Sequence, residues 1–167
     1  MTLALLNRRN LLIAGSSVLA SGVLAAGTSA LLLPAHADGL APTESMTGGA
    51  NNYRKGAPIV ERIGKGGFWM SGTVRRAGDG APLAGQRIQI WAHTVEGQEH
   101  EPQSHGATLT DKDGAFRLEM PQIIPIFGQP HGHLAYDSGE FKTVFLRPIM
   151  RSAKETSLEA HFVLQPV

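Results

Sequence analysis

From residue 68 onward, apolar and polar positions alternate along the chain with a period of two. The clearest case is the segment 87–93, where three aliphatic residues share one face and two ring-bearing residues share the other: Ile88, Ile90 and Ala92 against Trp91 and His93. Such alternation is typical of a β-strand with one buried face, because successive side chains point to opposite sides of a sheet. The segments 108–110 and 115–118 flank a tight turn at 111–114, which predicts a β-hairpin.

Three more strands are expected after a proline-bounded loop at 121–130. They cover residues 131–136, 141–146 and 158–164, and in the last of them the apolar residues face inward while His161 faces outward. No helical period of useful length appears after residue 37. Short alternating strands separated by glycine turns predict an all-β fold, an antiparallel β-sandwich over residues 67–167.

Residues 1–37 show the pattern of an export signal. Arg8 and Arg9 precede an apolar run at 11–33, which is diluted by glycine and serine and ends at Ala35-His36-Ala37, a small-x-small cleavage pattern. Paired arginines before a moderately hydrophobic run resemble a twin-arginine signal. We therefore expect export to the periplasm or the extracellular space. The alternative is an uncleaved membrane anchor, because the run is long enough to span a bilayer.

Residues 38–66 separate this signal from the predicted sandwich. They are rich in glycine and asparagine and contain little apolar surface to bury. We expect an irregular arm, which is either disordered or wraps a partner subunit in a homo-oligomer.

Cleavage of the signal would change the charge balance. Removing Arg8 and Arg9 from the 15 basic residues leaves 13 against 14 acidic ones, a net charge of −1. No lysine or arginine cluster remains, so we expect no nucleic-acid partner and no membrane association once the signal is removed. The chain has no cysteine, which excludes disulfides, thiolate metal sites and cysteine nucleophiles.

Two histidines separated by one glycine, His131 and His133, are the strongest candidates for chemistry. On a strand, residues i and i+2 project from the same face, so both imidazoles would point to one place. Neutral imidazole is a common ligand for iron, copper and zinc. Further imidazoles for a copper or zinc site come from His93, His100 and His105, in and beside an acidic loop.

Several short motifs resemble those of known β-sandwich families. Three of them recur in transthyretin-like modules: Gly72-Thr73-Val74, Pro82-Leu83-Ala84-Gly85 and Thr110-Asp111-Lys112-Asp113-Gly114-Ala115-Phe116. Two others are similar to the intradiol ring-cleavage dioxygenases, namely the tryptophan-ending strand 88–91 and His131-Gly132-His133 after the proline loop. The resemblance covers residues 68–167 and implies the sandwich fold of that family, a non-haem iron and a small aromatic substrate.

In the intradiol family, two tyrosines and two histidines hold a ferric ion. His131 and His133 match the histidines, whereas Glu99 and Ile124 stand where the tyrosines are expected, and Gly128 stands where the family has an arginine. The resemblance therefore implies a site with two histidines and one carboxylate, in which Glu99 is the third ligand. That donor set suits Fe(II) with open coordination positions.

These observations lead to two hypotheses of different classes. The first is an exported metal-binding protein that resembles intradiol dioxygenases, an oxidoreductase that opens a catechol-type ring with O2 or has diverged in its chemistry. The second is a non-catalytic β-sandwich module that binds a metal, a carbohydrate or a protein partner. A third ligand close to His131 and His133 would favour the first, and two histidines facing solvent would favour the second.

Overall fold

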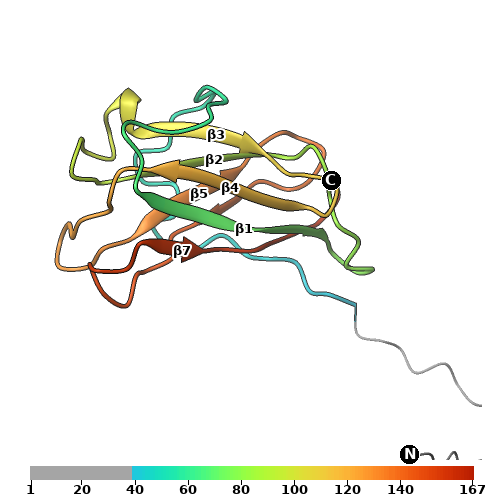
Figure 1. Ribbon diagram of the computed structural model, residues 1–167. Coiled ribbons are helices and arrows are strands. Elements are labelled where there is room, and N and C mark those ends of the chain that lie inside the picture. Colours follow the sequence, from blue (N-terminus) through green and yellow to red (C-terminus); the bar gives the residue numbers. More distant parts are fainter. Residues whose placement is uncertain (1–38) are drawn as a thin grey trace, which may run out of the picture. The chain divides into compact units, whose positions relative to one another are not determined.

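The computed structural model describes residues 39–167, which form two stacked β-sheets (Figure 1). The segment predicted as an export signal, residues 1–37, lies outside the described residues. Within 39–167 the only helix is the 3-10 turn η1 (Pro102–Ser104), and this part of the chain contains no helix with the length and apolar character needed to cross a membrane.

One sheet is built around the long strand β1 (Phe68–Arg76). β4 (Ala115–Met120) pairs with β1 in the antiparallel direction. β7 (Ser157–Glu159) and β8 (Phe162–Leu164) pair with successive parts of β1 in the parallel direction. This sheet is therefore mixed.

The other sheet is fully antiparallel. Its strands lie in the order β3 (His105–Leu109), β2 (Arg87–Ala92), β5 (Gly132–Tyr136) and β6 (Val144–Leu146). Buried apolar side chains from both sheets form one core, which includes Phe68, Met70, Val74, Ile88, Ile90, Ala92, Leu118, Leu134, Phe162 and Leu164. The predicted all-β sandwich is confirmed, as is the inward face of β2.

The predicted hairpin over residues 108–118 is wrong in its pairing. The tight turn exists, because Asp111 Oδ1 accepts hydrogen bonds from the backbone N–H groups of Asp113 and Ala115. However, β3 belongs to the second sheet and β4 to the first. The buried hydroxyl of Thr110 donates to the carbonyl of Leu83 at 2.6 Å, which fixes the chain where it crosses between the layers.

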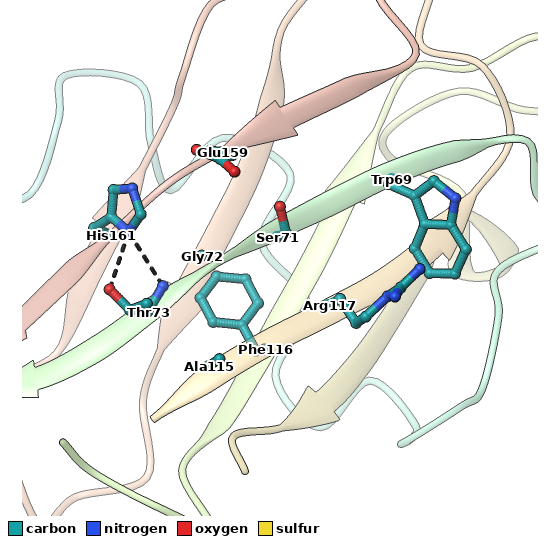
Figure 2. A pocket seen from close by; sticks show the side chains of 9 residues that line it. All are labelled: Trp69, Ser71, Gly72, Thr73, Ala115, Phe116, Arg117, Glu159 and His161. Atoms are coloured by element: carbon teal, nitrogen blue, oxygen red, sulfur yellow. Dashed lines mark hydrogen bonds between the residues drawn. The ribbon is translucent and has the colours of Figure 1, made fainter. Parts of the chain in front are cut away.

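The predicted last strand, 158–164, is interrupted between β7 and β8. Gly72 of β1 leaves room for the interruption, since a Cβ there would lie 1.6 Å from the carbonyl oxygen of Ala160. The N–H of Thr73 donates to Nδ1 of His161 at 3.2 Å, a side-chain bond within the strand ladder (Figure 2). His161 is exposed, as predicted, and lines a hollow of about 350 Å³ on the outer face of this sheet.

Residues 39–66 contain no helix and no continuous strand, yet they are fixed to the sandwich. The N–H of Met46 donates to the carbonyl of Phe145 on β6 at 2.8 Å, and that of Val60 donates to the carbonyl of Ala107 on β3 at 3.0 Å. β6 and β3 are opposite edges of the second sheet. Residues 46–60 therefore cross the outer face of that sheet, and we call them the crossing segment.

Candidate metal centre

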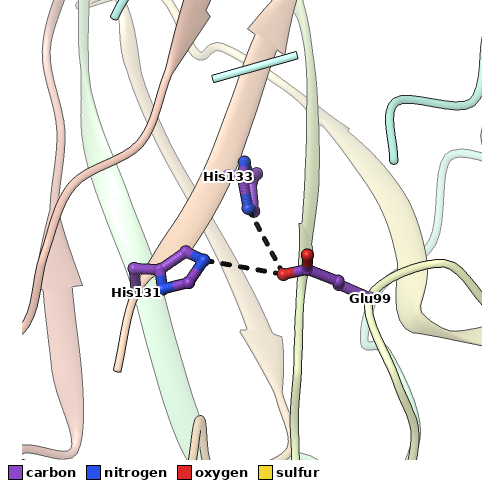
Figure 3. A group of neighbouring side chains, drawn as sticks. All are labelled: Glu99, His131 and His133. Atoms are coloured by element: carbon purple, nitrogen blue, oxygen red, sulfur yellow. Dashed lines mark ion pairs between the residues drawn. The ribbon is translucent and has the colours of Figure 1, made fainter. Parts of the chain in front are cut away.

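Glu99, His131 and His133 come together on the outer face of the second sheet (Figure 3). His133 lies in β5 directly opposite Trp91 of β2, His131 lies two residues earlier, and Glu99 lies in the loop after β2. Both imidazoles point toward the carboxylate, whose Oε2 is 3.6 Å from Nε2 of His131 and 3.4 Å from Nε2 of His133. The i, i+2 spacing and the loop position together produce this arrangement.

The crossing segment buries these side chains. Glu99 is 8 % exposed, His131 3 % and His133 0 %. The segment also bonds directly to two of them, because His133 Nδ1 lies 3.0 Å from the carbonyl oxygen of Gly49 and Asn52 Nδ2 donates to Glu99 Oε1 at 2.7 Å. The bond from Asn52 engages one carboxylate oxygen and leaves the other facing the imidazoles.

The backbone determines which imidazole nitrogens carry the proton. A carbonyl oxygen can only accept, so Nδ1 of His133 donates to Gly49, and Nδ1 of His131 donates to the carbonyl of Gln129 at 2.9 Å. The guanidinium of Arg147 lies 3.3 Å from the same Nδ1 of His131, but it is also a donor and the contact with Gln129 is shorter. In the neutral imidazoles both Nε2 atoms then present a lone pair toward Glu99.

The three facing atoms have the character of an incomplete ligand set. Oε2 of Glu99 and Nε2 of His133 are buried and have no hydrogen-bond partner, a condition that is rare and costly in folded proteins. Ligand bonds of about 2.0–2.2 Å spread at a tetrahedral angle place ligand atoms roughly 3.4 Å apart, which matches the observed separations. Two imidazoles and one carboxylate suit iron, zinc or copper rather than calcium or magnesium.

Electrostatics keep His133 ready to bind a cation. Burial lowers its pKa below 6.5, and the Gly49 carbonyl and the Glu99 carboxylate oppose that effect only in part. The imidazole is therefore neutral at pH 7, and its Nε2 lone pair is free for a metal without prior loss of a proton.

His105, another predicted ligand, instead contacts the backbone of Glu99 and the ring of Trp91. Its Nε2–H donates to the backbone carbonyl of Glu99 at 2.8 Å, and its Nδ1 accepts from Gln89 at 3.4 Å, so both nitrogens are engaged. Trp91 stacks between His105 and His133, with ring centroids 5.5 and 5.1 Å apart and interplanar angles of 8° and 10°. This stack orients the His133 ring and the loop that carries Glu99.

The other sequence candidates lie outside this group. His93 is not among the residues that converge on Glu99, and its carbonyl accepts from the N–H of Ile124. Sequence reasoning missed Gly49 and Asn52, whose arm has no periodic pattern. It also missed Arg147, which the antiparallel register of β5 and β6 places beside the histidine pair.

Comparisons with known proteins identify the fold of this chain. No family model and no curated protein matches the sequence. Solved structures do match. Hydroxyquinol 1,2-dioxygenase from Pseudomonas putida DLL-E4 has a TM-score of 0.58 at 13 % identity, with 77 % of this chain and 68 % of that chain covered. For 3-chlorocatechol 1,2-dioxygenase from Rhodococcus opacus 1CP the TM-score is 0.56 at 16 % identity, covering 78 % and 74 %.

This protein has the intradiol dioxygenase fold. A further match is the dioxygenase domain of a dioxygenase and carbohydrate-binding protein fusion from Streptomyces sp. SirexAA-E, with a TM-score of 0.56 at 14 % identity, covering 76 % of this chain and 99 % of that one. At these identities the likeness concerns the fold.

Proposed function

We propose that this protein binds one transition-metal ion through Glu99 Oε2, His131 Nε2 and His133 Nε2, and that iron is the favoured metal. The protein uses this ion for the O2-dependent opening of a catechol-type ring. The observation that carries the proposal is the set of buried, mutually facing acceptor atoms with no donor among them. The intradiol dioxygenase fold supports the reaction class. Bound iron would act as a Lewis acid and redox centre for the ring hydroxyls and O2.

The surrounding residues have distinct tasks. The carbonyls of Gln129 and Gly49 hold the two imidazoles in the tautomer that leaves Nε2 free, and Asn52 orients the carboxylate. Hydrogen bonds of this kind to metal ligands fix ring orientation and raise ligand basicity. Because the carboxylate takes the place of tyrosinate, the donor set favours Fe(II) over Fe(III) as the resting ion.

Burial favours a second candidate function, a non-catalytic module that holds zinc or copper as a structural ion. The three side chains are at most 8 % exposed, so a ring-sized substrate reaches them only when the segment around Gly49 and Asn52 moves aside. A structural metal needs no such movement, since structural sites are closed to solvent.

The setting of this function remains a proposal. Arg8 and Arg9 and the apolar run that follows support export to the periplasm or extracellular space. The likeness to dioxygenases of hydroxyquinol and chlorocatechol supports a small aromatic compound as the substrate. A homo-oligomer formed through the arm stays a prediction, which sedimentation of the purified protein would check.

An oxygen-uptake assay separates the two functions. The purified protein is loaded with Fe(II) under nitrogen, its iron content is measured, and O2 consumption is recorded with catechol and with hydroxyquinol. We expect one iron per chain, O2 uptake and a ring-opened product by mass spectrometry, all lost in His131→Ala and His133→Ala variants that fold correctly by circular dichroism. A His161→Ala variant, which removes an exposed histidine of the other sheet, should behave as wild type. Iron binding without O2 uptake would leave only the non-catalytic module. The same loading is repeated with Zn²⁺ and Cu²⁺, and binding of none of the three ions would refute both functions.

A further inference from the structure

A short series of aromatic rings leads away from the proposed metal centre. His133 stacks on Trp91 with centroids 5.1 Å apart, and Trp91 contacts Tyr53 of the crossing segment with centroids 5.8 Å apart. Both separations lie within the range of direct aromatic contact. Trp91 is fully buried, whereas Tyr53 is half-buried. The series therefore connects a ligand ring to a residue near the surface.

The far end of this series is equipped to release a proton. The phenol of Tyr53 donates a hydrogen bond to a carboxylate oxygen of Asp137, whose other oxygen lies 3.5 Å from Nη1 of Arg87. Burial and the Asp137 carboxylate both raise the pKa of Tyr53, so the phenol is protonated at rest with a proton acceptor already in place.

Packing alone does not require this polar arrangement. A phenylalanine at position 53 could make the same ring contacts with Trp91 and with Phe145, whose ring centroid lies 5.0 Å from that of Tyr53. Asp137 and Arg87 are both largely buried, and buried ion pairs are weak sources of stability. The hydroxyl and its acceptor thus point to a role beyond packing.

We propose that Trp91 and Tyr53 form an electron-transfer path from the metal centre toward the surface, with Tyr53 as its oxidisable end. The inference rests on the proposed function, because it needs a redox-active ion at Glu99, His131 and His133. The path protects the protein from self-oxidation. When a peroxide reacts at the reduced centre in the absence of substrate, Tyr53 is oxidised in place of the ligand residues.

The step balances with hydrogen peroxide as the oxidant. Peroxide takes up two electrons and two solvent protons, its O–O bond breaks, and two waters form. One electron comes from Fe(II), which ends as Fe(III), and the other comes from Tyr53 by way of Trp91. The phenolic proton of Tyr53 moves to the carboxylate of Asp137, which leaves a neutral tyrosyl radical on the chain.

Freeze-quench electron paramagnetic resonance tests the path. Fe(II)-loaded protein is mixed with equimolar hydrogen peroxide, and we expect a tyrosyl signal in the wild type that is lost in Tyr53→Phe and weakened in Trp91→Phe. The chain contains only two tyrosines and two tryptophans, so Tyr136→Phe and Trp69→Phe are matched controls that should keep the signal. Mass spectrometry should find more oxidation of His131 and His133 in Tyr53→Phe than in wild type.

The outcomes distinguish this inference from the function on which it rests. Iron uptake by Tyr53→Phe should equal that of the wild type, because the phenol is not a ligand. Iron bound by the wild type without a tyrosyl signal, or a signal that persists in Tyr53→Phe, overturns the path alone. No iron uptake by the wild type overturns the metal centre and the path with it.

Discussion

Replacing Glu99 with glutamine is expected to stabilise the metal-free protein while removing its metal site. In the wild type, Oε2 of Glu99 faces Nε2 of His131 at 3.6 Å and Nε2 of His133 at 3.4 Å. When both imidazoles are neutral and donate from Nδ1, none of these three atoms has a proton to share. A glutamine keeps an oxygen for Asn52 and turns an NH2 group toward the imidazoles. The substitution thus supplies the donor that the buried cluster lacks.

The size of the effect follows from the cost of an unpaired buried acceptor, about 1–3 kcal/mol. Because the new contacts would be longer than ideal, we expect a gain in unfolding free energy of about 1–2 kcal/mol, or roughly 3–10 °C in melting temperature for a domain of this size. Metal acts in the opposite sense, since an ion at about 100 times its dissociation constant stabilises the wild type by roughly 2.7 kcal/mol. The stability order of the two proteins therefore reverses when metal is added.

Thermal unfolding followed by circular dichroism checks this reversal. Wild type and Glu99→Gln are compared in EDTA and in excess Zn²⁺, with Glu159→Gln, an exposed glutamate of the other sheet, as the control that should match wild type in both. Lower stability of Glu99→Gln than of wild type in EDTA, or equal stabilisation of both proteins by Zn²⁺, would refute the prediction.

Three further predictions concern groups around the site and the fold. Burial raises the pKa of both Tyr53 and Tyr136, so ultraviolet titration of the folded protein should show no tyrosinate near pH 10. The unfolding free energy should fall above that pH, because only the unfolded chain releases those protons. A normal tyrosine titration in the folded protein would refute this. Burial lowers the pKa of His105 below 6.5, so unfolding free energy of the metal-free protein should fall as the pH drops below 6.5, and less steeply in His105→Gln; equal slopes by urea denaturation would count against it. Gly72→Ala should cost more than about 2 kcal/mol, because its Cβ would meet the carbonyl of Ala160 at 1.6 Å, and a loss below about 0.5 kcal/mol would contradict the interrupted strand.

The sequence predicts which face of a strand is buried better than it predicts which strands pair with each other. Alternation assigns Ile88 and Ile90 to the core and places His131 and His133 on one face, and the structure agrees. Alternation carries no information on which strand lies next to which. The hairpin prediction failed for this reason, because residues 108–118 alternate equally well whether the two strands pair or join different layers.

The residues of the metal centre also differ in how far the sequence predicts them. The histidine pair follows from spacing, and Glu99 follows only from the resemblance, because a charged loop residue has no pattern of its own. Gly49 and Asn52 could not be predicted, since one contributes a backbone carbonyl and the other a single amide from an aperiodic segment. Contacts of this kind depend on how the arm crosses the sheet, which is a property of the folded chain.

The most direct test of the account is an NMR titration of the metal-free protein with Zn²⁺ that follows the imidazole nitrogens through their long-range couplings to ring protons. Before metal, His131 and His133 should both carry their proton on Nδ1. On addition of equimolar Zn²⁺, their Nε2 signals should shift, each identified by its loss in the corresponding alanine variant, while those of His93 and His105 should not. A proton on Nε2 of either ligand in the metal-free protein, or Zn²⁺ shifts at His93 or His105 instead, would contradict the assigned centre.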